Sequence, residues 1–193
     1  MVPPNHKMDK KTLRKEALAK RNALVEHEID ILNEKLLNQF KTLDFSKVKS
    51  IHIFLPIGVK KEPNTFLMIE WLQQHHPAIV IVVPKADFSS NLMENYIFTK
   101  KEDLIVSPYH IPEPKEAQAF STIPDIVIVP LLAFDEKGYR VGYGKGFYDR
   151  FLQGISTQKI GLSFFNAVAE INDVHLNDIK LDKCITPNGI VVF

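Results

Sequence analysis

Two runs of β-branched residues, each followed directly by a proline, constrain the fold of this chain most strongly. They are Ala78-Ile-Val-Ile-Val-Val83 and Asp125-Ile-Val-Ile-Val129. Continuous apolar runs of this length are typical of parallel strands that are buried on both faces of a sheet. Ser50-Ile-His-Ile-Phe-Leu55 also precedes a proline and has the character of a short buried strand. The three segments therefore predict the centre of a mainly parallel sheet.

Helical patterns alternate with these strands. Capping residues and apolar spacing predict helices from Asp9, as N-cap, to Val25, from 26 to 43, from Thr65, as N-cap, to His76, and from 146 to 153. Further strands are expected over 92–98, 159–165 and 184–193, with a turn at 187–189 and an extended loop over 109–115. The alternation predicts an α/β fold, a three-layer sandwich with a central, mainly parallel sheet flanked by helices.

Composition narrows the classes of function. The chain has 193 residues and a formal net charge of +1, without the basic excess of a nucleic-acid-binding protein. It has one cysteine, no apolar run of the roughly 18 residues that cross a bilayer, and no visible signal peptide. We expect one α/β domain over residues 9–193 after a disordered or cloning-derived tail at 1–8. A cytoplasmic monomer without nucleic-acid or membrane partners is the expectation.

A glycine-rich segment, Arg140-Val-Gly-Tyr-Gly-Lys-Gly-Phe-Tyr-Asp149, is the main candidate site. Alternating glycines let successive N–H groups converge on a phosphate, and the helix predicted next adds its positive end. The spacing is neither the dinucleotide-binding pattern nor a P-loop. A plain glycine-rich turn between a strand and a helix is the alternative.

Charged and aromatic residues within this segment favour an anion-binding loop. Arg140 and Lys145 place positive charge at the turn, and Asp149 is suited to hold Mg²⁺ on bound phosphates. Three aromatic residues, Tyr143, Phe147 and Tyr148, suit a flat ring system better than core packing.

Three basic residues form a stripe on the first predicted helix. At about 100° per residue, Lys10, Arg14 and Arg21 fall within an arc of roughly 40° beside the apolar face. A solvated charged face is the common outcome for such a helix. Their position at the edge of the buried face favours an inward-reaching anion clamp.

Other polar residues leave alternatives open. Glu62, in the loop after the first strand, is either an exposed acid or an acceptor for N–H donors of a ligand ring. Asp178 and Asp182 fit a surface turn. None of the histidines has metal-ligand spacing, and the sequence contains no nucleophile elbow.

Taken together, these segments resemble the 5-formyltetrahydrofolate cyclo-ligase family. The match is most specific in Asp125-Ile-Val-Ile-Val-Pro-Leu-Leu-Ala-Phe-Asp135 and in the segment from Arg140 to Leu152. Shorter family-like elements follow in order from Lys10 and cover most of the chain: Lys10 with Leu13-Arg14, Phe54-Leu-Pro with Glu62 and Thr65, Val83-Pro-Lys85, Ile111-Pro-Glu-Pro114, and Asp178 with Leu181-Asp182 and Thr186-Pro187.

The resemblance implies an ATP- and Mg²⁺-dependent conversion of 5-formyltetrahydrofolate to 5,10-methenyltetrahydrofolate, with release of ADP and phosphate. The formyl oxygen attacks the γ-phosphorus, and N10 then closes the ring as phosphate leaves. Catalytic positions carried over are Lys10, Arg140 and Tyr148. ATP-binding positions are Lys10, Arg14, Arg140, Gly142, Tyr143, Gly144, Lys145, Gly146, Phe147, Tyr148 and Asp149. Leu55, Glu62 and Tyr148 match the folate pocket, and Asp149 and Asp178 match the metal ligands.

This sequence departs from the family pattern at three positions. Lys145 replaces a glycine, Phe147 a tyrosine, and Leu131 a glycine. We predict that the Lys145 ammonium adds an electrostatic contact to the phosphates. Two other hypotheses are an enzyme that binds phosphate without using ATP, such as a sugar-phosphate isomerase or an acyl-CoA transferase, and a non-catalytic binder.

Overall fold

A computed structural model describes residues 8–193. The tail predicted for residues 1–8 therefore lies outside the described residues except at its last position. Met8 forms a parallel bridge with Ile171, and its N–H donates to the carbonyl of Glu170 at 3.4 Å. The tail prediction is wrong for Met8, because an apolar side chain at this point packs beside Leu13 and Ile171.

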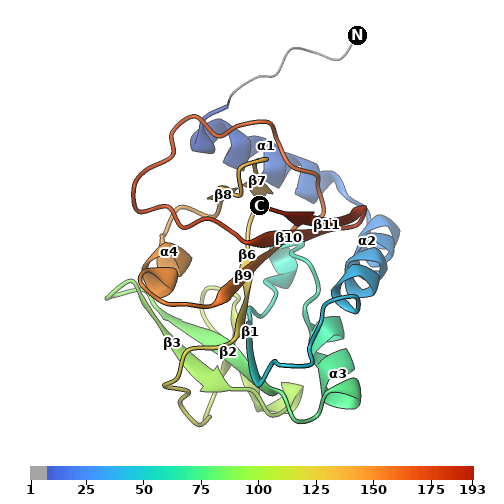
Figure 1. The fold of residues 1–193 in the computed structure, drawn as a ribbon, viewed down its shortest axis with the longest axis vertical. Helices are drawn as coiled ribbons and strands as arrows, with labels where there is room; N and C mark the ends of the chain where they lie inside the picture. Colours follow the sequence, from blue (N-terminus) through green and yellow to red (C-terminus); the bar gives the residue numbers. More distant parts are fainter. Residues whose placement is uncertain (1–7) are drawn as a thin grey trace.

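A seven-stranded sheet forms the centre of the molecule (Figure 1). Its order is β11 (Gly189–Val192), β10 (Lys183–Thr186), β9 (Gln158–Leu162), β6 (Ile126–Pro130), β1 (Ser50–Ile53), β2 (Val80–Asp87) and β3 (Leu92–Ile97). The pairs from β10 to β2 are parallel, and only the edge pairs β10–β11 and β2–β3 are antiparallel. The prediction of a mainly parallel sheet is confirmed.

Helices cover both faces of this sheet. Figure 1 shows α2 (Glu26–Phe40) and α3 (Phe66–His75) on one side and α4 (Phe147–Leu152) on the other. The first layer packs Leu36, Phe40 and Leu72 into the apolar cluster that contains Ile51. The second packs the α4 side chain Leu152 against strand β6. Successive side chains of a strand point to opposite faces, so the sheet has an apolar layer on each side and the expected three-layer arrangement results.

Strand β1 illustrates the alternation. Its residues Ile51 and Ile53 belong to the cluster under α2 and α3. His52 lies between them, pairs in register with Val127 of β6, and therefore faces α4. A fully buried histidine thus stands in the sheet layer beneath the glycine-rich loop.

Of the two N-cap residues predicted by side chain, one caps its helix and the other does not. Asp9 caps α1 (Lys10–Ala23), because its carboxylate accepts from the N–H of Thr12 at 2.7 Å. Thr65 precedes α3 as expected, but its hydroxyl donates to the carbonyl of Phe54 at 2.6 Å and caps no helix N–H. This buried bond ties the start of α3 to the end of β1.

Two small hairpins stand outside the main sheet. The first pairs β4 (Leu104–Val106) with β5 (Pro112–Pro114), so the expected loop over 109–115 is wrong for its middle residues. Prolines are tolerated in β5 because it has a partner on one side only. The second pairs β7 (Ala133–Phe134) with β8 (Arg140–Val141) and leads directly into the glycine-rich loop. Two 3₁₀ turns, η1 (Gly58–Lys60) and η2 (Lys101–Asp103), complete the described elements.

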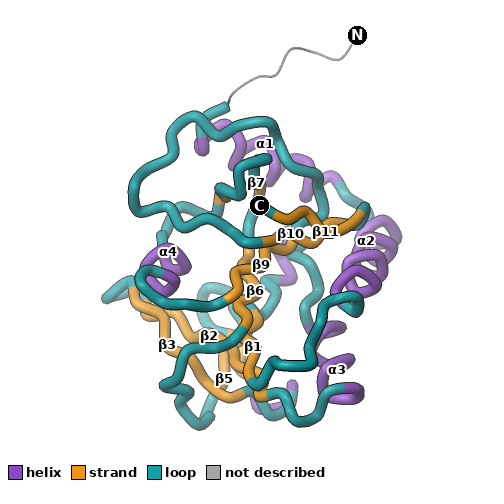
Figure 2. The backbone as a smooth tube through the Cα atoms, viewed as in Figure 1, coloured by secondary structure: helices purple, strands orange, loops and turns teal. Residues whose placement is uncertain are grey.

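A long segment without helix or strand joins β9 to β10 over residues 163–182. In Figure 2 it runs as a teal tube from the sheet past α1 and back to β10. Bridges from Met8 to Ile171 and from Asp135 to Val168 fasten it. It brings Asp178 to the same region as the glycine-rich loop.

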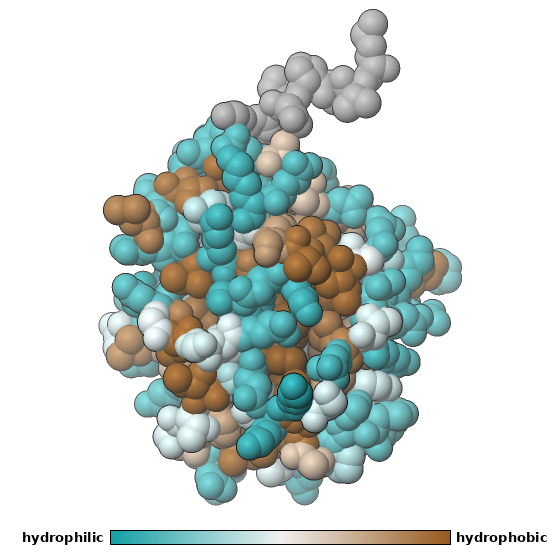
Figure 3. Space-filling model, in the orientation of Figure 1, coloured by the Kyte–Doolittle hydropathy of each residue, from teal (hydrophilic) through white to brown (hydrophobic). Residues whose placement is uncertain are grey.

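The surface shows no large continuous apolar face in the view of Figure 3, where hydrophilic and apolar side chains are interspersed. A brown patch lies near the C-terminal end, where Val192 and Phe193 are 68% and 36% exposed. Among the described residues, no helix combines the length and apolar character needed to span a membrane.

Candidate active site

The glycine-rich loop lies between β8 and α4. Gly144 and Gly146 have φ angles of +88° and +69°, a region that side chains rarely adopt. Lys145, between them, does not have a positive φ, which explains how a lysine replaces the family's glycine without strain. Gly146 is the N-cap of α4, and that helix has only six residues. The anion-binding geometry expected here therefore depends on the backbone turn itself rather than on a long helix dipole.

The basic stripe of α1 reaches inward, and each member has a different partner. Arg14 Nε donates to the carbonyl of Gly142 at 2.8 Å. A Cβ on Gly144 would lie 3.4 Å from Arg14 Nη2, so the guanidinium lies against the loop. The Lys10 ammonium forms an ion pair with Asp178. The expected clamp is thus split between the loop and the 163–182 segment.

Arg140 supports the loop from inside the protein. It is 8% exposed, and its Nη2 donates to Asp149 Oδ1 at 2.9 Å. Its Nη1 donates to the carbonyl of Ile179, whose own N–H donates to Asp149 Oδ1 at 3.2 Å. Burial lowers the pKa of Arg140, but the Asp149 charge opposes that shift, and an arginine remains protonated. Arg140 therefore connects the loop, Asp149 and the residue next to Asp178.

The two predicted metal ligands suit a hard cation held together with phosphates. Asp149 uses Oδ1 for its hydrogen bonds, and Asp178 uses Oδ2, which accepts from Lys10 and from the N–H of His175. Each carboxylate therefore keeps one oxygen for another ligand. Mg²⁺ is commonly held by one or two carboxylates, substrate phosphates and water. No larger cluster of metal-binding side chains occurs within residues 8–193.

Glu62 lies in a buried cluster that joins α1, the glycine-rich loop and the loop after β1. Its Oε1 accepts from the Tyr143 hydroxyl at 2.6 Å, and its Oε2 accepts from the N–H of Ile57 at 2.7 Å. Arg21 Nη1 donates to the Tyr143 hydroxyl at 3.2 Å and lies 4.0 Å from Glu62 Oε1. Glu62 and Arg21 are 7% and 3% exposed, so the alternative of an exposed loop acid is wrong.

Tyr143 is held on several sides in this cluster. The Lys60 ammonium lies 4.3 Å from the centroid of its ring, and Arg21 and Glu62 contact its hydroxyl. Burial and, next, the Glu62 charge raise the pKa of Tyr143, while Arg21 lowers it. The hydroxyl therefore remains a proton donor to Glu62 at neutral pH.

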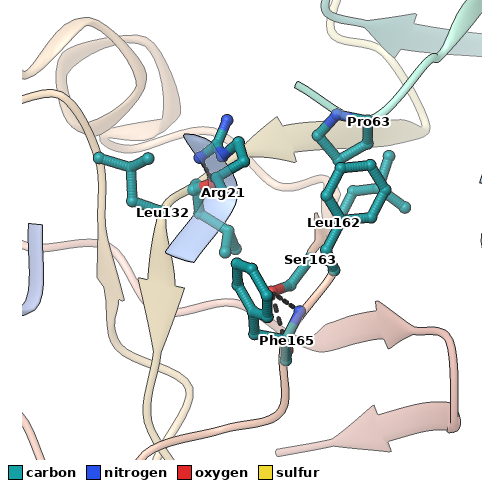
Figure 4. A pocket seen from close by; sticks show the side chains of 8 residues that line it. Arg21, Pro63, Leu132, Leu162, Ser163 and Phe165 are labelled. Carbon is teal, nitrogen blue, oxygen red and sulfur yellow. Dashed lines mark hydrogen bonds between the residues drawn. The ribbon is translucent and has the colours of Figure 1, made fainter. Parts of the chain in front are cut away.

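A narrow recess adjoins the cluster at the carboxyl ends of β6 and β9 (Figure 4). Its side chains leave no room for a water molecule, and its lining residues are Arg21, Pro63, Leu131, Leu132, Leu162, Ser163, Phe164 and Phe165. Ser163 and Phe165 exchange hydrogen bonds across the turn that follows β9. Small-molecule sites usually measure roughly 300 Å³ or more, so the recess is too small for a ring ligand in this conformation. Leu55, predicted for the folate pocket, is buried in the core cluster of α2 and α3.

A second hydrogen-bonded group holds Tyr148. Its hydroxyl lies 3.1 Å from His52 Nε2, and His52 Nδ1 lies 3.0 Å from Asn95 Oδ1. With Asn95 as acceptor, Nδ1 carries the proton and Nε2 accepts from Tyr148. Burial lowers the pKa of His52 to about 3, so the imidazole is neutral at neutral pH. Burial likewise raises the pKa of Tyr148.

The remaining predicted positions lie on the outer side of the loop. The Phe147 ring packs edge-on against the Phe88 ring, with 5.2 Å between the ring centroids, and the centroids of Phe88 and Tyr109 lie 4.0 Å apart. Lys145 is exposed, and its carbonyl accepts from Arg150 at 2.6 Å. Both residues are therefore part of the loop surface.

A larger hollow of about 440 Å³ lies beyond the Lys10–Asp178 pair. Asp178, Tyr139, Lys137 and His175 are among its lining residues. Its volume is in the range of small-molecule sites.

Three residues contact the predicted site residues, directly or through one another, in ways that the sequence did not indicate. Arg21 was recognised as part of the basic stripe, but its pairing with Glu62 and Tyr143 depends on tertiary structure. His52 is a polar residue inside an apolar strand pattern, and that irregularity was the available signal. Asn95 gave no signal, because its partner His52 lies 43 positions away.

Comparison with known proteins gives one consistent result. The model of the 5-formyltetrahydrofolate cyclo-ligase family matches residues 6–187. A probable 5-formyltetrahydrofolate cyclo-ligase from Schizosaccharomyces pombe is 28% identical over 87% of this chain and 90% of its own length. The 5-formyltetrahydrofolate cyclo-ligase of Mycoplasma pneumoniae is 31% identical over 81% of this chain and 86% of its own. The NMR structure of Aquifex aeolicus 5,10-methenyltetrahydrofolate synthetase superposes with a TM-score of 0.79 at 30% identity, covering 95% of this chain and 92% of that one.

Proposed function

The chain belongs to the 5-formyltetrahydrofolate cyclo-ligase family, and we propose that its glycine-rich loop joins an ATP-phosphate site to a folate site in a single reaction centre. As a member, it is a ligase of folate metabolism that converts 5-formyltetrahydrofolate to 5,10-methenyltetrahydrofolate with ATP. Membership removes the isomerase, acyl-CoA transferase and non-catalytic alternatives. The residues that carry the reaction are the subject of the proposal.

The nucleotide side consists of the loop backbone and its basic neighbours. Arg14 lies against Gly142 and Gly144, and Lys10 stands at Asp178. We assign Lys10, Arg14 and the backbone from Gly142 to Gly146 to the ATP phosphates. Converging N–H groups and guanidinium or ammonium groups are the usual phosphate ligands of proteins.

Asp149 and Asp178 are assigned to Mg²⁺, since each keeps a carboxylate oxygen for a further ligand. When bound, the ion supplies charge neutralisation on the phosphates. Arg140 orients Asp149, and Lys10 does the same for Asp178. The hollow beside Asp178 provides space for part of the nucleotide.

The folate side is the buried Glu62 cluster. A carboxylate is an acceptor for the amino and ring N–H groups of a pterin. Arg21 supplies the compensating positive charge, and Ile57 fixes the carboxylate through its backbone N–H. Leu55 supports this loop from the core, and Tyr148 packs between the loop and the sheet.

The reaction follows as two displacements. The formyl oxygen attacks the γ-phosphorus of ATP, the bond from that phosphorus to the ADP oxygen breaks, and a phosphorylated imidate-like group forms. N10 of the folate then attacks the formyl carbon, loses its proton, and the carbon–oxygen bond breaks to release phosphate. This chemistry needs positioning and charge neutralisation more than a dedicated acid or base.

One observation carries the proposal. The segment from Arg140 to Asp149 contacts Glu62 through Tyr143, and it contacts Ile179, the residue after Asp178, through Arg140. A single loop thus touches both halves of the centre. Holding two bound reactants in reacting geometry is a large contribution that such a site offers.

The test is a product assay with matched variants. Purified protein is incubated with 5-formyltetrahydrofolate, ATP and Mg²⁺ while the near-ultraviolet absorbance of the methenyl product is followed. Asp149→Ala should reduce kcat/KM on the order of 100-fold at limiting Mg²⁺. Asp103→Ala, which removes a carboxylate from η2, is the control and should leave turnover unchanged. Undiminished turnover in Asp149→Ala would reject the metal assignment.

A further inference from the structure

We propose that the Tyr143 hydroxyl occupies the folate-recognition carboxylate in the empty enzyme and is displaced from Glu62 by the N–H donors of the pterin. The inference rests on the assignment of Glu62 to the folate pocket. It adds a role for Tyr143 in substrate affinity that is distinct from the phosphate cradle.

The hydrogen bonds that already occupy both oxygens of the Glu62 carboxylate are the first reason. Tyr143 donates to Glu62 Oε1 at 2.6 Å, and Ile57 donates to Oε2 at 2.7 Å. A carboxylate oxygen has a second lone pair, so the Ile57 bond is compatible with a ligand on the same oxygen. The Tyr143 ring, by contrast, fills the space beside Oε1. Since Glu62 is 7% exposed, a pterin donor reaches it only when this ring moves.

Space in the neighbouring recess gives the second reason. The recess next to Arg21 and Pro63 has no room for a water molecule, and therefore none for a ring ligand. A movement at its edge is therefore required before a pterin binds near Glu62. Arg21 is the less mobile member of the edge, because its Nη2 donates to the Leu131 carbonyl at 3.2 Å and the side chain is 3% exposed.

The loop is built to let Tyr143 move. Glycines flank it on both sides, and no atom lies within 4 Å of the Cβ position at Gly142. Gly144 has a φ of +88° that is open to glycine and costly for other residues. The Lys60 ammonium over the Tyr143 ring and the Arg21 contact to its hydroxyl are the interactions lost on displacement. After displacement Arg21 still lies beside Glu62 and keeps the carboxylate paired.

Removal of the hydroxyl should therefore strengthen folate binding. Tyr143→Phe retains the ring but leaves Glu62 Oε1 without its donor, so binding no longer has to break that bond. Hydrogen bonds to charged groups have the strength to change affinity on the order of tenfold. Tyr96→Phe is the matched control, because Tyr96 donates to Glu94 at the same 2.6 Å on the exposed edge strand β3. That variant should bind folate as the wild type does.

The experiment is calorimetric titration of 5-formyltetrahydrofolate, without ATP, into wild type, Tyr143→Phe and Tyr96→Phe. The inference expects tighter binding in Tyr143→Phe alone. Equal or weaker binding in Tyr143→Phe, with measurable binding to the wild type, overturns the inference and leaves the proposed function intact. Absence of binding to all the proteins overturns the proposed function and the inference with it.

Hydrogen–deuterium exchange gives an independent readout. In the wild type, 5-formyltetrahydrofolate alone should raise exchange in residues 142–144, because Tyr143 is released. In Tyr143→Phe the exchange should already be high without ligand. Unchanged or lower exchange in the wild type on folate binding contradicts the displacement.

Discussion

Protonation of the buried His52 should make the stability of this enzyme depend on pH in a defined window. His52 is fully buried, and burial lowers its pKa from 6.5 to about 3. Above pH 6.5 both folded and unfolded chains hold a neutral imidazole. Below it the unfolded chain takes up a proton that the folded chain does not, so stability falls as pH falls until about pH 3.

The size of the effect follows from the two pKa values. Each unit of difference between the folded and unfolded pKa corresponds to about 1.36 kcal/mol of unfolding free energy once the pH is below both values. Between pH 7 and pH 5 the free energy of unfolding falls by roughly 2 kcal/mol. For a chain of this length that corresponds to roughly 4–8 °C in Tm. His52→Asn removes the titration while keeping a donor for Asn95 Oδ1. Its stability should therefore fall by about 2 kcal/mol less over the same interval.

The assay is urea unfolding of wild type and His52→Asn at pH 7, 6 and 5. Other titrating groups are common to both proteins and cancel in the difference. His27→Asn is the control, because His27 is exposed on α2 and its replacement should keep the slope of the wild type. If wild type and His52→Asn lose stability in parallel, the reasoning from burial is refuted.

Further predictions concern the loop and its support. Gly144→Ala should raise the KM for ATP several-fold, because the φ of Gly144 is +88° and the new Cβ would lie 3.4 Å from Arg14 Nη2. Gly154→Ala is the control: Gly154 has a φ of +75° in open space, so this variant should lose about 1 kcal/mol of stability and keep the KM of the wild type. Equal KM values in the two variants contradict the prediction. Lys145→Gly should weaken ATP binding and reduce its salt dependence, and titrations at low and high salt that match the wild type refute the contact. Arg140→Met should lower the free energy of unfolding, measured in urea, by about 2–3 kcal/mol. The substitution removes the hydrogen-bond donors to the Ile179 carbonyl and to Asp149, whose side chain is 33% exposed. A loss below about 0.5 kcal/mol contradicts the supporting role of Arg140.

The centre of the sheet was predictable because its information is local. Strands β6 and β2 begin with continuous runs of β-branched residues, which are typical of a parallel sheet covered on both faces. The cap at Asp9 was equally local, since its partner Thr12 lies three residues away. The hairpin of β7 and β8 was missed, because strands of two residues carry no periodicity.

The site was predictable in its loop and less so in its partners. Glycine spacing marked the segment from Gly142 to Gly146, and the resemblance to the family supplied Glu62. No pattern in the sequence joins Arg21 to Tyr143 across 122 positions or His52 to Tyr148 across 96. Such pairs depend on how α1 and α4 pack on the sheet. For the same reason the burial of Glu62 was left open, because a lone acid in a loop is exposed in most proteins.

The most direct test of the account is to follow the formyl oxygen. 5-Formyltetrahydrofolate labelled with oxygen-18 in the formyl group is converted with ATP and Mg²⁺, and the products are analysed by mass spectrometry. Attack of that oxygen on the γ-phosphorus predicts one labelled oxygen in each phosphate released. Unlabelled phosphate, with the label recovered in water, would contradict the proposed phosphoryl transfer in the loop from Arg140 to Asp149.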